Sequence, residues 1–218
     1  MLNVLKLFMK LIIGFIFCAS STVFMLNSNL GLSPWDVFHE GLSNISGMTI
    51  GQASIIVSLC VIILGILLGQ KLGIGTILNI LIVGKFIDLI NESNIIPVAN
   101  NLFTGILMMI IGMLTMGYGC YLYISCGLGC GPRDGVMLSL SEKLNKPIKI
   151  IRAIIEVTVL VTGFILGGTV GIGTFISAFG LGYCIQLIFK MFKFDATNVR
   201  HKSILECLDF KGLSRKFE

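Results

Sequence analysis

Six long apolar runs alternate with short polar connections along the chain. Each run is close to the 20 residues that a helix needs to cross a hydrocarbon core about 30 Å thick. Backbone groups in lipid must bond within their own segment, so runs of this length predict helices. The predicted spans are residues 5–27, 49–68, 74–91, 102–125, 149–167 and 173–192. The pattern predicts an all-α integral membrane protein.

Composition agrees with this pattern. Hydrophobic residues make up 55% of the 218 residues and charged residues 12%, whereas about a quarter of the residues in soluble domains are charged. The net charge of +5 is spread over connections and the C-terminal end rather than gathered on one polar face. We therefore interpret the basic residues as orientation signals and expect no nucleic-acid partner.

The first run resembles a secretory signal peptide. Lys6 and Lys10 lie ahead of its uncharged part, and small residues occur at 19–21. The run nevertheless continues to Leu26, which is long enough to cross a bilayer. We expect it to remain as the first helix of the mature chain.

The chain repeats itself at an offset of 98 residues. Segments 11–90 and 109–188 align without a gap, and roughly a quarter of the 80 aligned positions are identical. The shared Gly, Pro, Asp and Thr residues are not explained by common hydrophobicity. The repeat predicts two three-helix halves, residues 1–98 and 99–192, followed by a charged cytoplasmic tail, residues 193–218, in water or along the membrane surface.

An odd number of spans in each half predicts that the second half is inverted relative to the first. With both termini in the cytoplasm, 15 of the 16 Lys and Arg residues lie in inside segments or toward the inside ends of spans, and the outside loops carry none. Lys85, on the third span, is the exception. This asymmetry follows the positive-inside rule and predicts cytoplasmic N- and C-termini.

A short helix is predicted after the first span of each half. Ser33 is placed to cap it, Pro34 occupies its first position, and Asp36 lies near the positive end of the helix dipole. In the second half, Pro132 and Asp134 repeat the arrangement. Capping alone accounts for the Pro and Asp residues.

The repeat differs where Trp35 corresponds to Arg133. Apolar residues follow at helical spacing, so each short helix either lies in the membrane interface, with Trp35 at the level of the headgroups, or dips back into the protein as a re-entrant element. The interfacial form is the commoner one. The re-entrant form is the functional one, because broken-helix N-termini often surround a central site.

A Gly-Ile-Gly-Thr motif opens the third span of each half. Glycine permits a tight reversal and threonine can cap the following helix, so structure alone explains the motif; a substrate role is the minority interpretation. The residues concerned are Gly73, Gly75, Thr76, Gly171, Gly173 and Thr174.

Ionisable residues within the spans are the stronger functional candidates, because burying them is costly. Glu156 follows Arg152 by one helical turn, so the two can form an ion pair. The repeat equivalent of Glu156 is Ser58, and an asymmetric carboxylate suits a proton or substrate site as well as it suits a structural pair. For Lys85 and Asp88 we favour a structural pair.

The residues for enzyme or metal chemistry are sparse. The seven cysteines form no Cys-x-x-Cys pair, and neither His39 nor His201 has metal-binding spacing. No Gly-x-Ser-x-Gly nucleophile motif or phosphate-binding loop is present. We therefore expect no enzyme, cofactor or metal site.

The ordered motifs together resemble the YczE-like bacterial integral membrane proteins of the YczE/YyaS/YitT group. The resemblance spans roughly residues 10–190 and leaves out the charged tail. It rests on residues 31–37, 41–43, 73–76, 131–135, 152–156 and 167–174. It implies a multi-pass protein of the bacterial plasma membrane and marks Arg152 and Glu156 as family features, and the group has no agreed substrate or reaction.

The leading hypothesis is a small secondary transporter, because an inverted 3+3 duplication supplies the two halves that alternating access needs. Its substrate would be a small solute, with a proton as a possible second partner. The residues expected to face a central path are Asp36, Arg133, Asp134, Arg152 and Glu156. The alternative is an accessory or regulatory membrane protein that acts through a partner protein or as a homodimer. Substrate, coupling ion, direction of flux and oligomeric state stay open.

Overall fold

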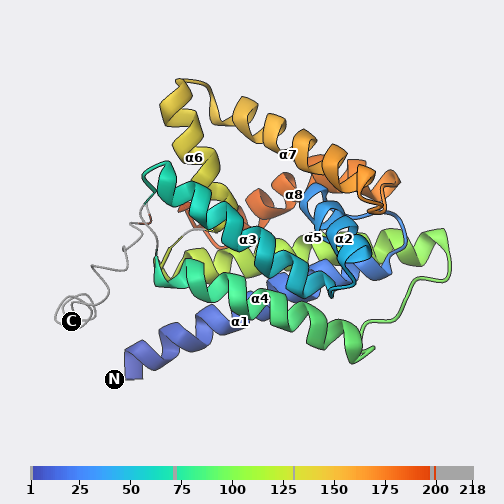
Figure 1. Ribbon diagram of the computed structural model, residues 1–218. Helices are drawn as coiled ribbons and strands as arrows, with labels where there is room; N and C mark the ends of the chain where they lie inside the picture. The colour runs from blue at the N-terminus through green and yellow to red at the C-terminus, as the bar shows by residue number, and fades with distance from the viewer. Residues whose placement is uncertain (1, 71–72, 130, 197–198, 200–218) are drawn as a thin grey trace.

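The computed structural model describes residues 2–70, 73–129, 131–196 and 199, and within them it contains eight α-helices and no strand (Figure 1). The helices are α1 (Leu2–Asn27), α2 (Pro34–Ser46), α3 (Ile50–Leu67), α4 (Ile74–Glu92), α5 (Leu102–Ile124), α6 (Pro132–Leu144), α7 (Ile148–Ile165) and α8 (Ile172–Met191). The six predicted spans and two predicted short helices are all present as helices. Every predicted span end lies within three residues of the observed one.

Five helices, α1, α3, α4, α5 and α8, are long and apolar enough to cross a membrane. The sixth predicted span, α7, has 18 residues but carries three charged residues, Lys149, Arg152 and Glu156, which is unusual for a helix that crosses a membrane. The outer faces of the helices are apolar: Leu67 and Phe179, for example, are 74% and 75% exposed. Exposed apolar surface of this extent fits contact with lipid.

The centre of the bundle is the pair α1 and α5, which pack along one another. Small residues allow the close approach. A Cβ atom on Gly119 would lie 2.9 Å from the backbone nitrogen of Cys18, and one on Gly14 would lie 3.1 Å from the carbonyl oxygen of Gly119. The hydroxyl of Ser21 donates to the carbonyl of Gly112 at 2.7 Å, which ties the two helices together across the contact.

The remaining helices surround this pair in corresponding places. α4 packs on α1 as α8 packs on α5, and α2 packs on α7 as α6 packs on α3. One correspondence fails: α3 packs along α4, whereas α7 hardly touches α8. A Cβ atom on Gly84 would lie 2.7 Å from the carbonyl oxygen of Gly51 on α3, while nothing lies within 4 Å of one on Gly182, the repeat equivalent in α8.

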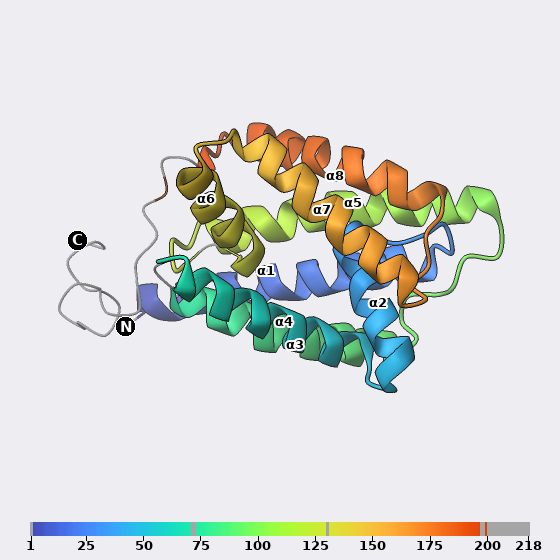
Figure 2. The ribbon, with the colours of Figure 1, turned by 45° about the horizontal axis from the view of Figure 1, so that its top comes forward.

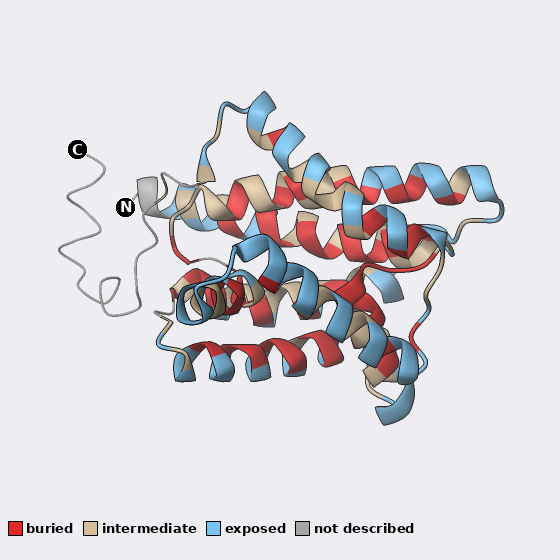
Figure 3. Ribbon diagram, turned by 90° about the horizontal axis from the view of Figure 1, so that it is seen from above, coloured by how far each residue is buried: buried red, intermediate tan, exposed pale blue. Residues whose placement is uncertain are grey.

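The short helices α2 and α6 occupy opposite ends of the bundle (Figure 2). Both begin inside it and run outward. In α2 the first four residues, 34–37, are buried, whereas Ile45 near its end is 65% exposed. The expectation of a helix lying in the interface, with Trp35 among headgroups, is therefore wrong for α2, because Trp35 is only 9% exposed. Figure 3 shows buried and exposed positions alternating along the helices.

The Gly-Ile-Gly-Thr motifs join the two halves. Gly75 N–H donates to the carbonyl of Leu128 at 2.8 Å, and Gly173 N–H donates to the carbonyl of Leu30 at 2.7 Å. Gly73 and Gly171 occupy the N-cap positions of α4 and α8. Thr174, three residues after Gly171, contributes to the cap of α8 by accepting from the N–H of Gly171 at 3.2 Å.

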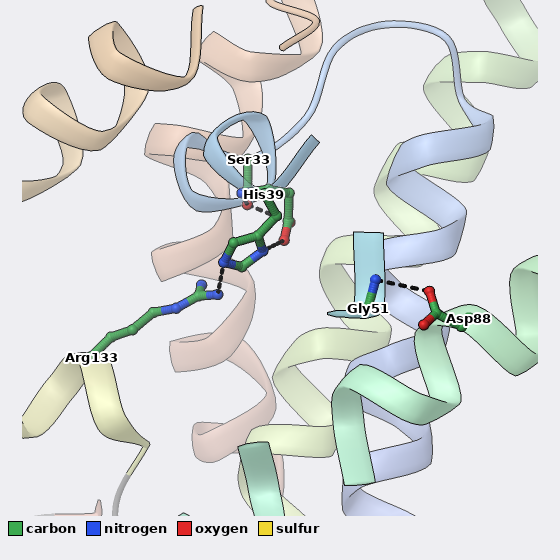
Figure 4. A network of polar contacts seen from close by, with 6 residues as sticks. Ser33, His39, Gly51, Asp88 and Arg133 are labelled. Carbon is green, nitrogen blue, oxygen red and sulfur yellow. Dashed lines mark hydrogen bonds and ion pairs between the residues drawn. The ribbon is translucent and has the colours of Figure 1, made fainter. Parts of the chain in front are cut away.

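Asp88 has a different partner from the predicted one. No ion pair with Lys85 occurs within 4.0 Å in the described part of the chain. The Asp88 carboxylate instead accepts from the hydroxyl of Thr49 at 2.6 Å, at the start of α3. It also accepts from the N–H of Gly51 at 2.8 Å (Figure 4). An anion there stabilises the positive end of the helix. The predicted tail, residues 193–218, lies almost wholly outside the described residues.

Candidate functional site

A polar cavity of about 200 Å³ lies between α1, α5 and the starts of α2 and α6. All five residues expected to face a central path line it, and so do four predicted helix-start residues. The nine are Ser33, Pro34, Trp35, Asp36, Pro132, Arg133, Asp134, Arg152 and Glu156. The glycines and threonines of the Gly-Ile-Gly-Thr motifs do not line it. The structure thus brings the predicted charged residues together in one place, and their role stays a prediction.

The start of α2 delivers Asp36 to the cavity. Ser33 caps the helix, as predicted, and accepts from the N–H of Asp36 at 3.4 Å. The Ser33 hydroxyl also donates to Asp36 Oδ2 at 2.5 Å. A charge-assisted bond of this length holds the carboxylate beside the first turn, where the helix dipole favours negative charge.

His39 is a residue that the sequence reasoning passed over. It lies one helical turn beyond Asp36, is fully buried, and places Nδ1 3.5 Å from Asp36 Oδ1. On its other side, Nε2 lies 3.3 Å from Nη2 of Arg133 (Figure 4). His39 therefore connects the first half of the chain to the second. The i, i+3 spacing from Asp36 was the available signal, because residues three apart share a helix face.

Arg133 enters the cavity from the first turn of α6. Its guanidinium lies 4.5 Å from the centre of the Trp35 ring, in a cation–π arrangement. No carboxylate of the described residues lies within 4.0 Å of it. Trp35 and Arg133, which occupy equivalent positions in the two repeats, are thus stacked on one another.

The surroundings of Asp36 and His39 at the start of α2 lower the pKa of both side chains. Burial lowers the pKa of His39, and the nearby charge of Arg133 lowers it further, against the opposing effect of Asp36. Burial alone would raise the pKa of Asp36, but contacts with His39, the charge of Arg133 and the Ser33 hydroxyl together lower it. A neutral His39 can accept the proton that Arg133 donates.

Asp134 follows Arg133 and is open to the cavity. Enclosure within the bundle raises the pKa of Asp134, while Arg152 and Arg133 oppose this shift and Glu156 adds to it. The repeat-related carboxylates Asp36 and Asp134 are thus shifted in opposite directions. Pairs of this kind, in which environment separates two like groups, are common at functional sites.

Arg152 and Glu156 form the predicted ion pair on α7, with Nε 2.8 Å from Oε1. Their side chains are 49% and 21% exposed, and both line the cavity. The ion pair expected for a structural role is therefore present. The same pair lies in the cavity, where a substrate or proton site was expected. The geometry alone fits both interpretations.

Neutral polar side chains complete the lining. Ser54 and Ser58 project from α3, Asn79 from α4 and Ser177 from α8. Ser54 and Ser58 are the repeat equivalents of Arg152 and Glu156, so one wall of the cavity is neutral and the other is charged. Within the described residues, no three His, Cys, Asp or Glu side chains are grouped to hold a metal ion.

Fold and site together define a polytopic helical membrane protein with a charged cavity at its centre. The profile of a family described as "Family of unknown function (DUF6198)" matches residues 5–190, and the chain belongs to this family.

Named relatives extend the assignment. An "Uncharacterized protein" of Haemophilus influenzae is 35% identical over 164 residues, covering 75% of this chain and 74% of the relative. The "Uncharacterized membrane protein YczE" of Bacillus subtilis is 35% identical over 72% of this chain and 73% of its own length. "Uncharacterized protein YyaS" of the same organism is 27% identical over 76% and 83%. The predicted resemblance to YczE and YyaS is confirmed. No solved structure matches.

Proposed function

We propose that the protein is a small secondary transporter in which two inverted halves alternate around the central cavity, with α7 as the sixth span. The observation that carries the proposal is the symmetry of the cavity. Of its 26 lining residues, 24 form twelve pairs that stand 98 residues apart, the repeat offset. A cavity built from equivalent positions of two halves lies on the axis that relates them, where transporters with inverted repeats bind substrate.

The packing supports an inverted arrangement. Gly75 bonds to Leu128 as Gly173 bonds to Leu30, so each half holds the loop of the other by an equivalent contact. The short helices lie at opposite ends of the bundle (Figure 2). Arg133 and Arg152 line the cavity and do not count as loop charges. The other predicted inside charges still favour cytoplasmic termini.

The difference between the halves supports two alternating states. α3 is closed onto α4, with Gly84 at the contact, while α7 stands away from α8 and leaves Gly182 uncovered. If the two halves exchange conformations, the second state has α7 closed onto α8 and α3 released. Rocking of one such element against the rest is the usual way that inverted repeats expose a site to either side.

Glu156 is the proposed proton or cation carrier. Glu156 lies in the cavity wall and forms an ion pair with Arg152. Arg152 holds the Glu156 side chain when the carboxylate is ionised and releases it when the carboxylate is protonated. The neutral repeat equivalent of Glu156, Ser58, shows that the scaffold does not require a carboxylate at this position. A carboxylate that the fold does not need is a functional candidate.

A ligand screen tests the proposal. The purified protein is unfolded thermally against a panel of metabolites and ions, beside Glu156→Gln, and each stabilising compound is then measured for uptake into proteoliposomes with and without a pH gradient. We expect a compound at 100 times its Kd to stabilise the folded state by about 2.7 kcal/mol, and gradient-driven uptake that Glu156→Gln abolishes. Uptake unaffected by the gradient and by the variant would contradict the assignment of Glu156.

The second candidate is an accessory membrane protein that acts through a partner. One observation favours it: the 2.8 Å bond between Arg152 and Glu156 already satisfies the carboxylate without a substrate. In that case the pair is structural and the cavity has no transport role. A screen with no stabilising compound and no uptake would favour this candidate.

A further inference from the structure

A second cavity, of about 460 Å³, lies against the first and has an entirely different character. Side chains of α2, α3, α6 and α7 line it, and apart from Arg133 they are all apolar or, in Cys60, weakly polar. We call it the apolar chamber. Its volume falls within the range of about 300–1,000 Å³ that is typical of small-molecule sites.

Trp35 and Arg133 are the two residues that line both cavities. The stacked pair therefore forms the partition between a charged compartment and an apolar one. A molecule that reaches past this pair meets charge on one side and hydrocarbon on the other.

We infer that the substrate of the proposed transporter is a single-chain anionic amphiphile, with a carboxylate head bound by Arg133 and an alkyl chain in the apolar chamber. The inference rests on the proposed function and names its substrate class.

The charge of Arg133 argues for an anionic head. Its neighbours within bonding distance are His39 and the ring of Trp35, and no described carboxylate lies within 4.0 Å. By contrast, Arg152 is already paired with Glu156. Asp36 and Asp134 act on Arg133 from a longer range, so its guanidinium N–H groups are not taken up by a carboxylate and can bind one through two parallel hydrogen bonds.

The shape of the apolar chamber argues for one chain that enters from the membrane. Its inner wall consists of buried residues, including Val57, Val61 and Val136. Its outer rim on α3 is exposed: Ile56 is 41% and Leu64 53% accessible. The chamber therefore opens on the outer side of α3, toward lipid, where an alkyl chain is already dissolved.

Trp35 makes the inference measurable, because it is the only tryptophan of the chain. The protein is placed in nanodiscs of unbrominated neutral lipid, and quenching of Trp35 fluorescence is titrated with a medium-chain carboxylate brominated at its far end. The brominated alcohol of equal chain length is the matched ligand without charge. We expect the carboxylate to bind at least about tenfold more tightly than the alcohol, which corresponds to about 1.4 kcal/mol.

Variants separate the contribution of the ligand's carboxylate head from that of its alkyl chain. Arg133→Gln should bring the carboxylate to within about twofold of the alcohol, and Arg133→Lys should retain part of the preference, since charge is kept without the planar fork. Cys60→Phe fills the rim and should weaken both ligands. Leu59→Phe, at a neighbouring position that does not line the chamber, is its control and should weaken neither.

Equal binding of carboxylate and alcohol to the unmodified protein would overturn the inference, and so would equal effects of Cys60→Phe and Leu59→Phe. Quenching only by brominated two-chain phospholipid would also overturn it, in favour of a structural lipid. The titration measures binding without flux. Selective binding with no uptake would therefore remove the transport proposal alone, while uptake of a polar solute without quenching would remove this inference alone.

Discussion

The backbone amide of Gly173 donates a hydrogen bond of 2.7 Å to the carbonyl of Leu30, which lies in the other half of the chain. Gly75 makes the equivalent bond to Leu128 at 2.8 Å. These bonds fasten the start of α8 to the loop before α2, and the start of α4 to the loop before α6. The Gly-Ile-Gly-Thr motifs are thus contact points between the halves, and the loops they hold position the cavity.

Gly73→Ala and Gly171→Ala should each destabilise the protein by about 1–3 kcal/mol. A Cβ atom would lie 2.1 Å from the carbonyl oxygen of Leu128 in the first case and 2.3 Å from that of Leu30 in the second. Both glycines have negative φ angles of −99° and −153°, so the loss comes from crowding and not from backbone strain. The measurement is thermal unfolding, with Gly182→Ala as the control, since nothing lies within 4 Å there. Equal melting temperatures for all three variants would contradict the contact.

His39 should make stability depend on pH. Because burial lowers its pKa below the usual 6.5, the unfolded chain binds a proton that the folded protein does not as the pH falls through that value. Stability should therefore decrease as the pH is lowered from about 7 to 5, with a slope of at most about 1.4 kcal/mol per pH unit from this residue.

The control for the pH dependence is His39→Gln, a variant that removes the titratable imidazole and keeps a side chain that can form hydrogen bonds. Contributions from groups that do not contact His39 are common to both proteins, so the difference between their pH profiles belongs to His39 and to Asp36, whose pKa His39 helps to lower. A parallel pair of profiles between pH 5 and 7 would show that His39 is not buried as a neutral ring.

Exchanging the residues of the ion pair separates the two candidate functions. The double variant Arg152→Glu, Glu156→Arg keeps an i, i+4 pair but moves the carboxylate by one turn of α7. Stability should stay within about 0.5 kcal/mol, since a partly exposed pair contributes little, while gradient-driven uptake is lost. Full activity in the exchanged protein would favour the structural role and the accessory protein.

Arg133 should determine the emission of Trp35. Removing the guanidinium in Arg133→Gln takes away a cation–π contact worth about 0.5–2 kcal/mol and changes the environment of the single indole. We expect a shifted emission maximum and a lower melting temperature. Arg152→Gln, a charge lost elsewhere in the same cavity, should leave the emission unchanged; if both variants shift it equally, the ring reports general electrostatics and not the stacked pair.

The sequence predicted the helices and the charged residues well because both depend on local pattern. Apolar runs of span length place the six long helices, and Pro34 and Pro132 mark the starts of the short ones. How deeply α2 enters the bundle was not predictable, since interfacial and re-entrant helices both have one apolar face. His39 was missed because its spacing of three residues from Asp36 indicates only a shared helix face and not the contact with Arg133, 94 residues away.

The contacts between the halves were beyond sequence reasoning for a similar reason. A motif such as Gly-Ile-Gly-Thr is explained locally by a turn and a cap, so nothing in the residues indicates that Gly75 meets Leu128. The same holds for the separation of α7 from α8, which distinguishes two halves of equal pattern. Tertiary packing decides both features.

The central claim is that the two halves are inverted around one cavity, and the side of the membrane that each short helix faces tests it most directly. Ile45→Cys and Lys143→Cys stand at repeat-equivalent, exposed positions near the ends of α2 and α6. Each is introduced into a variant lacking the seven native cysteines and labelled in intact cells with a membrane-impermeant maleimide. The account predicts labelling at position 45 and none at 143 until the membrane is opened. Labelling of both positions, or of neither, from the outside would contradict it.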